Sequence, residues 1–228
     1  MRRALKWLVA ALVAVVLFAG AFIAWYVFGE NPPGKPKLGA VADTQGGPAT
    51  PVGSWHVVRG KNVYVGYRIK ELFGDAILKR DAVGQTRSVT GTLTIAGDRV
   101  TAAVVSGDVA QLTSSREARD AYVRDNSLDT SKYPTARFTL TKPMTLPAHL
   151  ARGVKISVPA TGTLLLHGVT RPITITLDAR WNGPTIDVIG TAPIQLRDYR
   201  IKPPHTVIAS VDDHGSLELE LTFAPGAH

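Results

Sequence analysis

An alternation of apolar and polar side chains, running from Trp55 almost to the C-terminus, constrains the fold of this chain more than any other feature. It is clearest over residues 173–181 and 217–223, where aliphatic side chains alternate with threonine, aspartate or glutamate. A period of two is the pattern of β-strands with one dry face and one wet face. Such strands belong to antiparallel sheets, because parallel strands covered on both faces are apolar throughout.

The same alternation recurs over 63–70, 92–95 and 100–104, and a Gly97-Asp98 turn separates the last two segments. Counting such segments predicts about eight to ten strands, which would form a closed barrel, of about eight strands, or a sandwich. A barrel of about eight strands is either filled by its own side chains or holds one small ligand. Periodicity does not decide between these two cases. The predicted fold class is therefore all-β and antiparallel.

One short helix is predicted within the β pattern. Ser114 is suited to cap its N-terminus, and Glu117, three residues on, would complete a capping box. The helix should end near Asn126, and Pro134 bars its continuation. The apolar positions predicted on one face are Ala118, Ala121 and Tyr122.

The N-terminus carries a membrane signal. Arg2, Arg3 and Lys6 precede an uncharged run from Trp7 to Phe28, which is long enough to span a hydrocarbon core about 30 Å thick. Basic residues before the run predict that the N-terminus stays in the cytoplasm. Residues 1–28 are therefore predicted to form a cytoplasmic stub and a transmembrane signal-anchor helix.

A cleaved signal peptide is the alternative for this segment, since Ala19-Gly20-Ala21 resembles a cleavage site. Cleavage there would leave an exposed apolar tail, so the uncleaved anchor is favoured. Both alternatives put the body outside the cytoplasm. The abundance of Ala, Val, Gly and Arg suggests a bacterial source. The expected location is a single-pass protein of the cytoplasmic membrane, or a periplasmic or secreted protein if the segment is removed.

Residues 29–53 are rich in proline and glycine and show no apolar periodicity, so they are predicted to be a linker. Residues 54–228 are predicted to form the β-domain. Lys and Arg outnumber Asp and Glu by 26 to 18, without a long basic run. This favours an anionic lipid or head group over nucleic acid as a partner.

Several kinds of chemistry are excluded or not expected. The chain has no cysteine, which excludes disulfides, thiolate metal sites and cysteine nucleophiles. No cofactor-binding fingerprint is present, and the histidines lack metal-ligand spacing. We expect no metal, no cofactor and no enzymatic activity. The histidines considered are His149, His205, His214 and His228.

Two stretches resemble a known family. In the first, Arg119–Asp129 is followed by Tyr133-Pro134 and, four residues after this proline, by Phe138. The second is Gly162–Pro172, which contains His-Gly-Val-Thr-Arg-Pro. In order and spacing both resemble the YceI-like polyisoprenoid-binding family, over Gly53 to about Phe223. The first strand lacks the Asp and His common in that family, and Glu71 stands where a second His is common.

The resemblance implies an extended lipocalin-like antiparallel barrel whose lumen holds a long isoprenoid chain. A lumen of this kind needs a long dry cavity and a few polar groups at its mouth. Each candidate wall residue is equally suited to ordinary core packing. The candidates are Val65, Tyr67, Leu93, Ile95, Tyr122, Phe138, Leu164, Leu166, Ile173, Ile175, Leu219 and Leu221.

Three polar residues are candidates for contact with a lipid head group: Arg119, His167 and Arg171. For Arg119, a structural salt bridge is the favoured role. For His167, we favour a turn residue whose ring bonds the backbone, because a general base would need a nearby carboxylate and nucleophile. Arg171 is as well suited to bracing the barrel as to binding an anionic group.

The sequence thus predicts a membrane-anchored, extracytoplasmic binding protein for a polyisoprenoid or a similar long-chain amphiphilic lipid. One alternative is a non-catalytic envelope module with a filled barrel. Another is an enzyme acting on an isoprenoid with His167 as its base. The oligomeric state, the length of the lipid and the direction of any transport are left open by the sequence.

Overall fold

The computed structural model describes residues 12–22, 24, 29, 31–41, 46–73, 78–148, 150–204 and 209–226. The chain divides into two compact units, Met1–Pro33 and Gly34–His228. Residues from Gly34 on therefore belong to the same unit as the β-domain, although the predicted linker extends to residue 53.

Within the described residues, the second unit contains one sheet of eleven strands, and every pairing in it is antiparallel. The strands are β1 (Gly53–Val57), β2 (Tyr64–Phe73), β3 (Leu78–Thr86), β4 (Val89–Ala96), β5 (Arg99–Asp108), β6 (Thr135–Leu140), β7 (Met144–Thr145), β8 (Lys155–Leu166), β9 (Val169–Trp181), β10 (Ile186–Gln195) and β11 (Ala209–Pro225).

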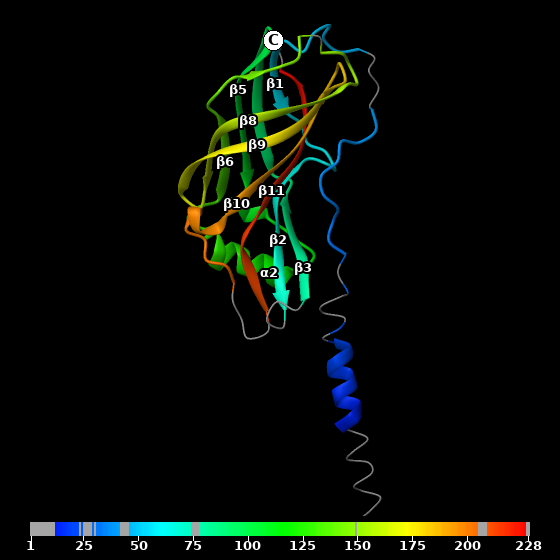
Figure 1. Ribbon diagram of the computed structural model, residues 1–228, viewed down its shortest axis with the longest axis vertical. Helices are drawn as coiled ribbons and strands as arrows, with labels where there is room; N and C mark the ends of the chain where they lie inside the picture. The colour runs from blue at the N-terminus through cyan, green and yellow to red at the C-terminus, as the bar shows by residue number, and fades with distance from the viewer. Residues whose placement is uncertain are drawn as a thin grey trace, which may run out of the picture. The chain divides into compact units, whose positions relative to one another are not determined.

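The sheet closes on itself because β1 pairs with both β4 and β11 (Figure 1). The ring runs β1-β4-β5-β6-β8-β9-β10-β11. Strands β1 and β2 lie end to end along β11, and β3 and β4 likewise follow one another beside them. The result is an eight-stranded antiparallel barrel. Beyond the ring, β2 continues the position of β1 and β3 continues that of β4. The predicted barrel is confirmed.

Burial follows the predicted alternation only in part, because on β2 and β11 the outward-facing Arg68 and Glu218 are buried as well. A strand outside the predicted segments shows the regular pattern. In β10, Val188, Ala192 and Ile194 are buried, whereas Thr191 and Pro193 are exposed. The strand predicted over 173–181 is β9, and that over 217–223 is part of β11. The inner face of the barrel is therefore the apolar face of each alternating segment.

Two large apolar clusters lie on the inner face. The tryptophan cluster contains Trp55, Val63, Val89, Leu93, Ile95, Val100, Leu146, Trp181, Ile186, Val188, Leu221 and Phe223. The helical-end cluster contains Val109, Leu112, Leu128, Leu164, Leu166, Ile194, Leu196, Tyr199 and Ile201. Each large side chain buried in this way stabilises the fold by about 1.5–3 kcal/mol.

Short helical turns adjoin the helical-end cluster. They are η1 (Val109–Gln111), α2 (Glu117–Tyr122), the π-turn η2 (Val123–Ser127) and η3 (Leu196–Tyr199). Helix α2 lies beyond the ends of β6 and β10 (Figure 1). Its predicted start is corrected, because it begins at Glu117 and Ser114 does not cap it.

The predicted apolar face of this helix is also corrected. Ala118 is exposed, and the Tyr122 side chain is 42% exposed and belongs to none of the apolar clusters. The buried residue of α2 is instead Asp120, whose carboxylate accepts hydrogen bonds from the Ser114 amide and hydroxyl. A buried carboxylate with these donors is satisfied, so the polar side of the helix faces the barrel.

The segment predicted as a linker is bonded to the barrel; we call residues 34–51 the strap. Arg68 and Glu218 point outward from β2 and β11 but are only 8% and 2% exposed. Arg68 donates to Glu218 at 2.6 Å and to Asp81 at 3.2 Å, and its Nη2 also donates to the Gly34 carbonyl at 3.1 Å. The strap thus accepts a guanidinium hydrogen bond that the two carboxylates leave available.

Two more arginines bind the strap in the same manner. Arg180 is 6% exposed and donates to the carbonyls of Gly39 and Ala40, both at 2.9 Å. It also lies 3.6 Å from the Asp187 carboxylate. Arg152 donates to the carbonyls of residues 46 and 48 and lies over the ring of Trp181. The described residues of this proline-rich segment form no strand, but arginine side chains donate hydrogen bonds to several of its carbonyls.

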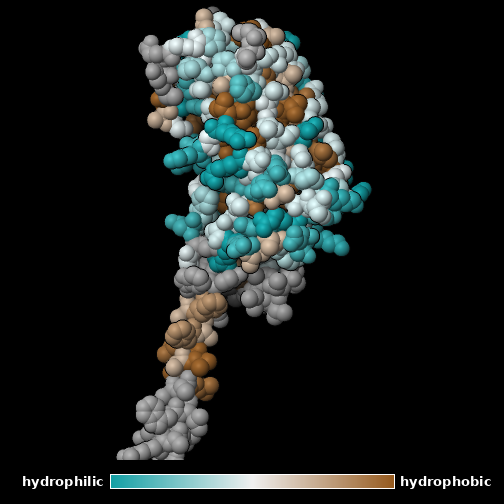
Figure 2. Space-filling model, turned by 180° about the vertical axis from the view of Figure 1, so that it is seen from behind, coloured by the Kyte–Doolittle hydropathy of each residue, from teal (hydrophilic) through white to brown (hydrophobic). Residues whose placement is uncertain are grey.

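In the first unit, residues 12–22 and 24 are helical. Apolar side chains are exposed around this helix, which Figure 2 shows as brown atoms. The exposed residues include Leu12, Val13, Val15, Val16, Leu17, Phe18 and Phe22. Within the described residues, no helix is both long and apolar enough to cross a membrane. The predicted transmembrane run from Trp7 to Phe28 includes residues outside the described ranges.

Replacing Arg180 by methionine should release the strap. The free energy of unfolding should fall by about 3 kcal/mol, because Asp187 loses its buried cationic partner. Trypsin should then cleave faster after the exposed Lys37, since cleavage needs a detached segment. Denaturant unfolding and a digestion time course measure these effects. Arg197→Met, at an exposed position on η3, is the control; equal digestion of both variants would contradict the role of Arg180.

Candidate functional site

Between the two large clusters, the inner face carries a band of apolar side chains that are only partly buried. These residues pack against the clusters and so face inward, yet part of each surface remains accessible to a water-sized molecule. Side chains meeting at the centre of a solid core would lose this surface. The lumen band comprises Val65, Tyr67, Val105, Phe138, Leu140, Ile173, Leu177, Leu217 and Leu219.

Two aromatic rings of the band lie against the wall instead of crossing the lumen. A Cβ atom added at Gly84 would fall 2.4 Å from Cε1 of Tyr67, and one added at Gly162 would fall 2.7 Å from Cε2 of Phe138. Each ring therefore occupies the space that a side chain on the neighbouring strand would take. The two rings therefore lie along the wall of the barrel.

Tyr67 also marks where the lumen band meets polar groups. Burial raises the pKa of its hydroxyl to about 12, the charge of Arg119 lowers it, and Asp120 and Glu71 raise it further. The phenol is thus surrounded by protein although part of the side chain stays accessible.

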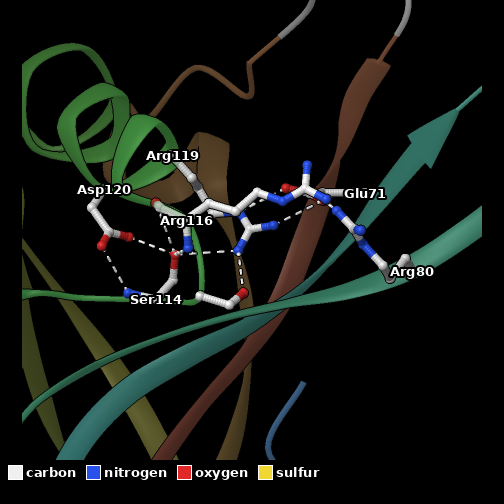
Figure 3. Close-up of polar contacts among 7 residues, drawn as sticks. Glu71, Arg80, Ser114, Arg116, Arg119 and Asp120 are labelled. Carbon is white, nitrogen blue, oxygen red and sulfur yellow. Dashed lines mark hydrogen bonds and ion pairs between the residues drawn. The ribbon is translucent and has the colours of Figure 1, made fainter. Parts of the chain in front are cut away.

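The polar groups near Tyr67 form the cluster drawn in Figure 3. Glu71 of β2 accepts two hydrogen bonds from Arg119 of α2, at 2.8 and 3.1 Å. It also accepts one from Arg80 of β3 at 2.5 Å. On the other side of Arg119, the Ser114 hydroxyl donates to Asp120. One carboxylate, Glu71, therefore connects helix α2 to two strands of the barrel wall.

This geometry confirms the salt bridge favoured for Arg119. Its side chain is 10% exposed, and a bidentate Arg–carboxylate pair of this kind is among the stronger ion pairs in proteins. Contact between Arg119 and a head group stays a prediction. The family resemblance alone would not have identified this pair, because Glu71 departs from the histidine that the resemblance implies.

His167 has the role favoured for it, that of a turn residue. It and Gly168 form the two-residue turn between β8 and β9 with φ angles of +50° and +72°, which this kind of hairpin requires. The Nδ1 atom of His167 donates to the Tyr199 carbonyl at 2.9 Å, because a carbonyl can only accept. The ring of Tyr133 packs edge-on against it. Asp178 instead pairs with Ser157 and Lys155.

Arg171 lines a cleft of about 440 Å³ in the barrel wall. The β9–β10 ladder ends at the pair Thr176–Thr191, and beyond it the two strands diverge. The Nε atom of Arg171 donates to the Asp198 carbonyl at 3.2 Å. The cleft is lined by Arg171, Pro172, Ile173, Pro193, Ile194, Gln195, Asp198 and Tyr199.

The predicted wall residues fall into three positions. Val65, Tyr67, Phe138, Ile173 and Leu219 are in the lumen band. Leu93, Ile95, Leu221, Leu164, Leu166 and Ile175 are buried in the apolar clusters. Tyr122 alone among the predicted wall residues is exposed.

Several members of the band were not among the predicted wall residues. Leu177 and Leu217 follow the same alternation as their predicted neighbours, so the pattern itself could have identified them. For Val105, the predicted alternation over 100–104 had the wrong phase: the β4–β5 register shifts between Thr94 and Ile95, so Ala103 and Val105 pack against the tryptophan cluster and Ala102 is exposed. Leu140 lies in a segment with weaker alternation. Within the described residues, no group of three or more acidic or histidine side chains is arranged to hold a metal ion.

Comparison with known proteins identifies the family. The chain belongs to the family of the YceI-like domain, whose profile matches residues 59–223. A UPF0312 protein of Vibrio vulnificus (strain YJ016) is 29% identical over 152 residues, which cover 63% of this chain and 74% of that protein. A UPF0312 protein of Pseudomonas putida (strain W619) is 29% identical over 168 residues, covering 70% and 81%.

Solved structures share the fold. A polyisoprenoid binding domain from Saccharophagus degradans, implicated in plant cell wall breakdown, superposes with a TM-score of 0.56 at 17% identity, covering 75% of this chain and 98% of that one. BcnA of Burkholderia cenocepacia superposes with a TM-score of 0.53 at 17% identity, covering 68% and 95%. At this identity the likeness shows the fold alone.

The raised pKa of Tyr67 predicts a loss of stability in alkali. The folded chain binds this proton more tightly than the unfolded chain, so the stabilisation present below pH about 10 is lost as the pH rises toward about 12. Tyr67→Phe should remove this contribution. The pKa of Tyr64 is also raised to about 12, so the variant should still lose the part of its alkaline stability that depends on Tyr64. Denaturant unfolding across this pH range and tyrosinate absorbance measure both. Tyr122→Phe is the control; identical alkaline profiles for the two variants would contradict the assignment.

Proposed function

We propose that this protein binds a polyisoprenoid or a similar long-chain amphiphilic lipid within its barrel, on the extracytoplasmic side of a membrane to which its N-terminal segment anchors it. The lumen band is the observation that supports the binding role. Its side chains are apolar, face inward and keep accessible surface between two buried clusters.

The energetics of such binding are favourable. Each CH₂ group moved from water into an apolar environment gains about 0.8 kcal/mol. Several isoprene units would therefore exceed an association cost of about 4–15 kcal/mol. No charged side chain belongs to the lumen band, so binding a hydrocarbon there would leave no charge without its solvent.

Two comparisons support the proposed ligand class. The chain belongs to the YceI-like domain family, and one solved domain of the same fold is described as polyisoprenoid binding. A binding role needs no catalytic group. His167, the candidate base, uses its Nδ1 proton to hold the Tyr199 carbonyl.

The anchor rests on a separate observation. Apolar side chains are exposed at successive positions of the N-terminal helix, including Val15, Val16, Leu17 and Phe18. A helix that is apolar on all sides requires an apolar environment, such as a protein core or a bilayer. The basic residues at positions 2, 3 and 6 favour a cytoplasmic N-terminus.

A bulky side chain in the lumen band should exclude the lipid. In Leu177→Trp the indole would project inward from β9, whereas in Thr176→Trp, at the next position, it would project outward. We expect the purified full chain to carry polyprenoid, which organic extraction and mass spectrometry would detect. Leu177→Trp should lose most of it, and Thr176→Trp should retain it.

The same extraction tests the alternatives. A full chain that carries no lipid and takes none up would favour the filled envelope module. Equal lipid contents in Leu177→Trp and Thr176→Trp would contradict binding in the lumen. Turnover of an isoprenoid that is lost in His167→Ala would favour the enzyme.

A charge in the N-terminal helix should weaken membrane retention. Val16→Arg would put an arginine near the centre of the anchor, at a cost of about 2.5–3.5 kcal/mol for insertion. Alkaline extraction of membranes should therefore release more of this variant than of the unchanged chain or of Val16→Leu. Complete release of the unchanged chain would contradict the anchor while leaving lipid binding untouched.

A further inference from the structure

The wall of the barrel has a seam between β9 and β10. The β9–β10 pairing stops at Thr176–Thr191. Beyond it, residues 169–175 at the start of β9 pair only with β8, and residues 192–195 at the end of β10 pair only with β11. Each diverging stretch contains a proline, Pro172 or Pro193. Proline cannot donate a backbone hydrogen bond, which explains why a ladder is not continued there.

Two isoleucines of this seam also belong to the apolar interior. Ile194 is buried in the helical-end cluster, and Ile173 packs against both that cluster and a smaller one formed by Ala160, Ile175 and Ala192. Both isoleucines also line the cleft. A lipid hydrocarbon tail entering the cleft would therefore contact apolar side chains that also belong to the barrel interior.

The rim of the seam is polar. Arg171 is exposed, and its one hydrogen bond within the described part of the chain uses Nε, so its two terminal nitrogens remain available. The side chain of Gln195 also lines the cleft. A guanidinium with two available nitrogens matches the geometry of a phosphate group.

The rim also contains an opposing charge. Asp198 lines the cleft, and its carboxylate would repel an anion. Arg119 and Arg80 at the α2 end differ from Arg171, because both are already bonded to Glu71. Of these three arginines, Arg171 is the one that lines an open cleft, and no carboxylate among the described residues is bound to its terminal nitrogens.

We propose that the β9–β10 seam is the head-group site of the barrel, where Arg171 binds the phosphate of a polyprenyl phosphate whose chain passes over Ile173 and Ile194 into the lumen. This inference rests on the proposed lipid-binding function and adds the chemical class of the head group. It also gives Asp198 a defined effect, that of limiting the affinity for phosphate.

The test compares two ligands that have the same hydrocarbon tail and different head groups. Geranylgeranyl phosphate and geranylgeraniol have the same hydrocarbon chain and differ only in the phosphate. Partition of that hydrocarbon into detergent micelles therefore affects both ligands alike and cancels in the ratio of their affinities. The full chain, in non-ionic detergent, should prefer the phosphate. Arg171→Gln should reduce affinity for the phosphate about tenfold, the effect of losing one charge-assisted hydrogen bond, and leave the alcohol unchanged. Asp198→Asn should shift the ratio in the opposite direction.

Arg197→Gln is the matched control, because Arg197 is exposed on η3 but does not line the cleft. A similar loss in this variant would overturn the proposal in favour of general electrostatic attraction. An unchanged ratio in Arg171→Gln would overturn it while lipid binding stands, and binding of neither ligand by the full chain would refute the proposed function itself. Inorganic phosphate that displaces geranylgeranyl phosphate with equal affinity would assign the seam to free phosphate and overturn the lipid site.

Discussion

The pairing of β1 with both β4 and β11 is the constraint on which the rest of this structure depends. It converts an open antiparallel sheet into a closed barrel, and closure gives every strand an inside and an outside. Alternate side chains of each strand then point into the barrel or away from it. Aliphatic side chains collect within the barrel, and threonines and charged residues face outward.

Closure does not by itself leave a space for a ligand. In this barrel, the proposed ligand space is supported by the positions of the large side chains. Trp55 and Trp181 belong to one cluster and Tyr199 to the other, while Tyr67 and Phe138 lie along the wall over glycines. The largest buried residues thus gather in two clusters, and the band between them keeps accessible surface. Small residues on the inner face are as important to this arrangement as the aliphatic ones.

Arginine–carboxylate pairs attach the other parts of the chain to the barrel. Glu71 connects Arg119 of α2 to the wall, and the outward-facing pairs of Arg68 and Arg180 hold the strap. In each case the guanidinium has more donors than one carboxylate can accept, and the remaining donors bind further groups. This explains how a proline-rich segment whose described residues form no helix or strand can belong to a compact unit.

The sequence by itself determined the local features: the strands, the Gly97-Asp98 turn, the His167-Gly168 turn and the presence of one α-helix after β5. These depend on side-chain periodicity and backbone preferences within a few residues. It also identified most of the inward face, and the resemblance named the family. It failed for Tyr122, because a six-residue helix is oriented by the buried partners of Asp120 and not by its own apolar positions.

Only the tertiary structure decided which strands close the ring, where β9 and β10 part, and that the strap is held by arginines distant in sequence. A period of two says which side chains share a face but not how far apart facing side chains lie. Likewise, the sequence shows Pro172 and Pro193 but not that they lie on neighbouring strands, where together they mark the gap between β9 and β10. These features depend on contacts between residues far apart in the chain, and no local pattern encodes such distances.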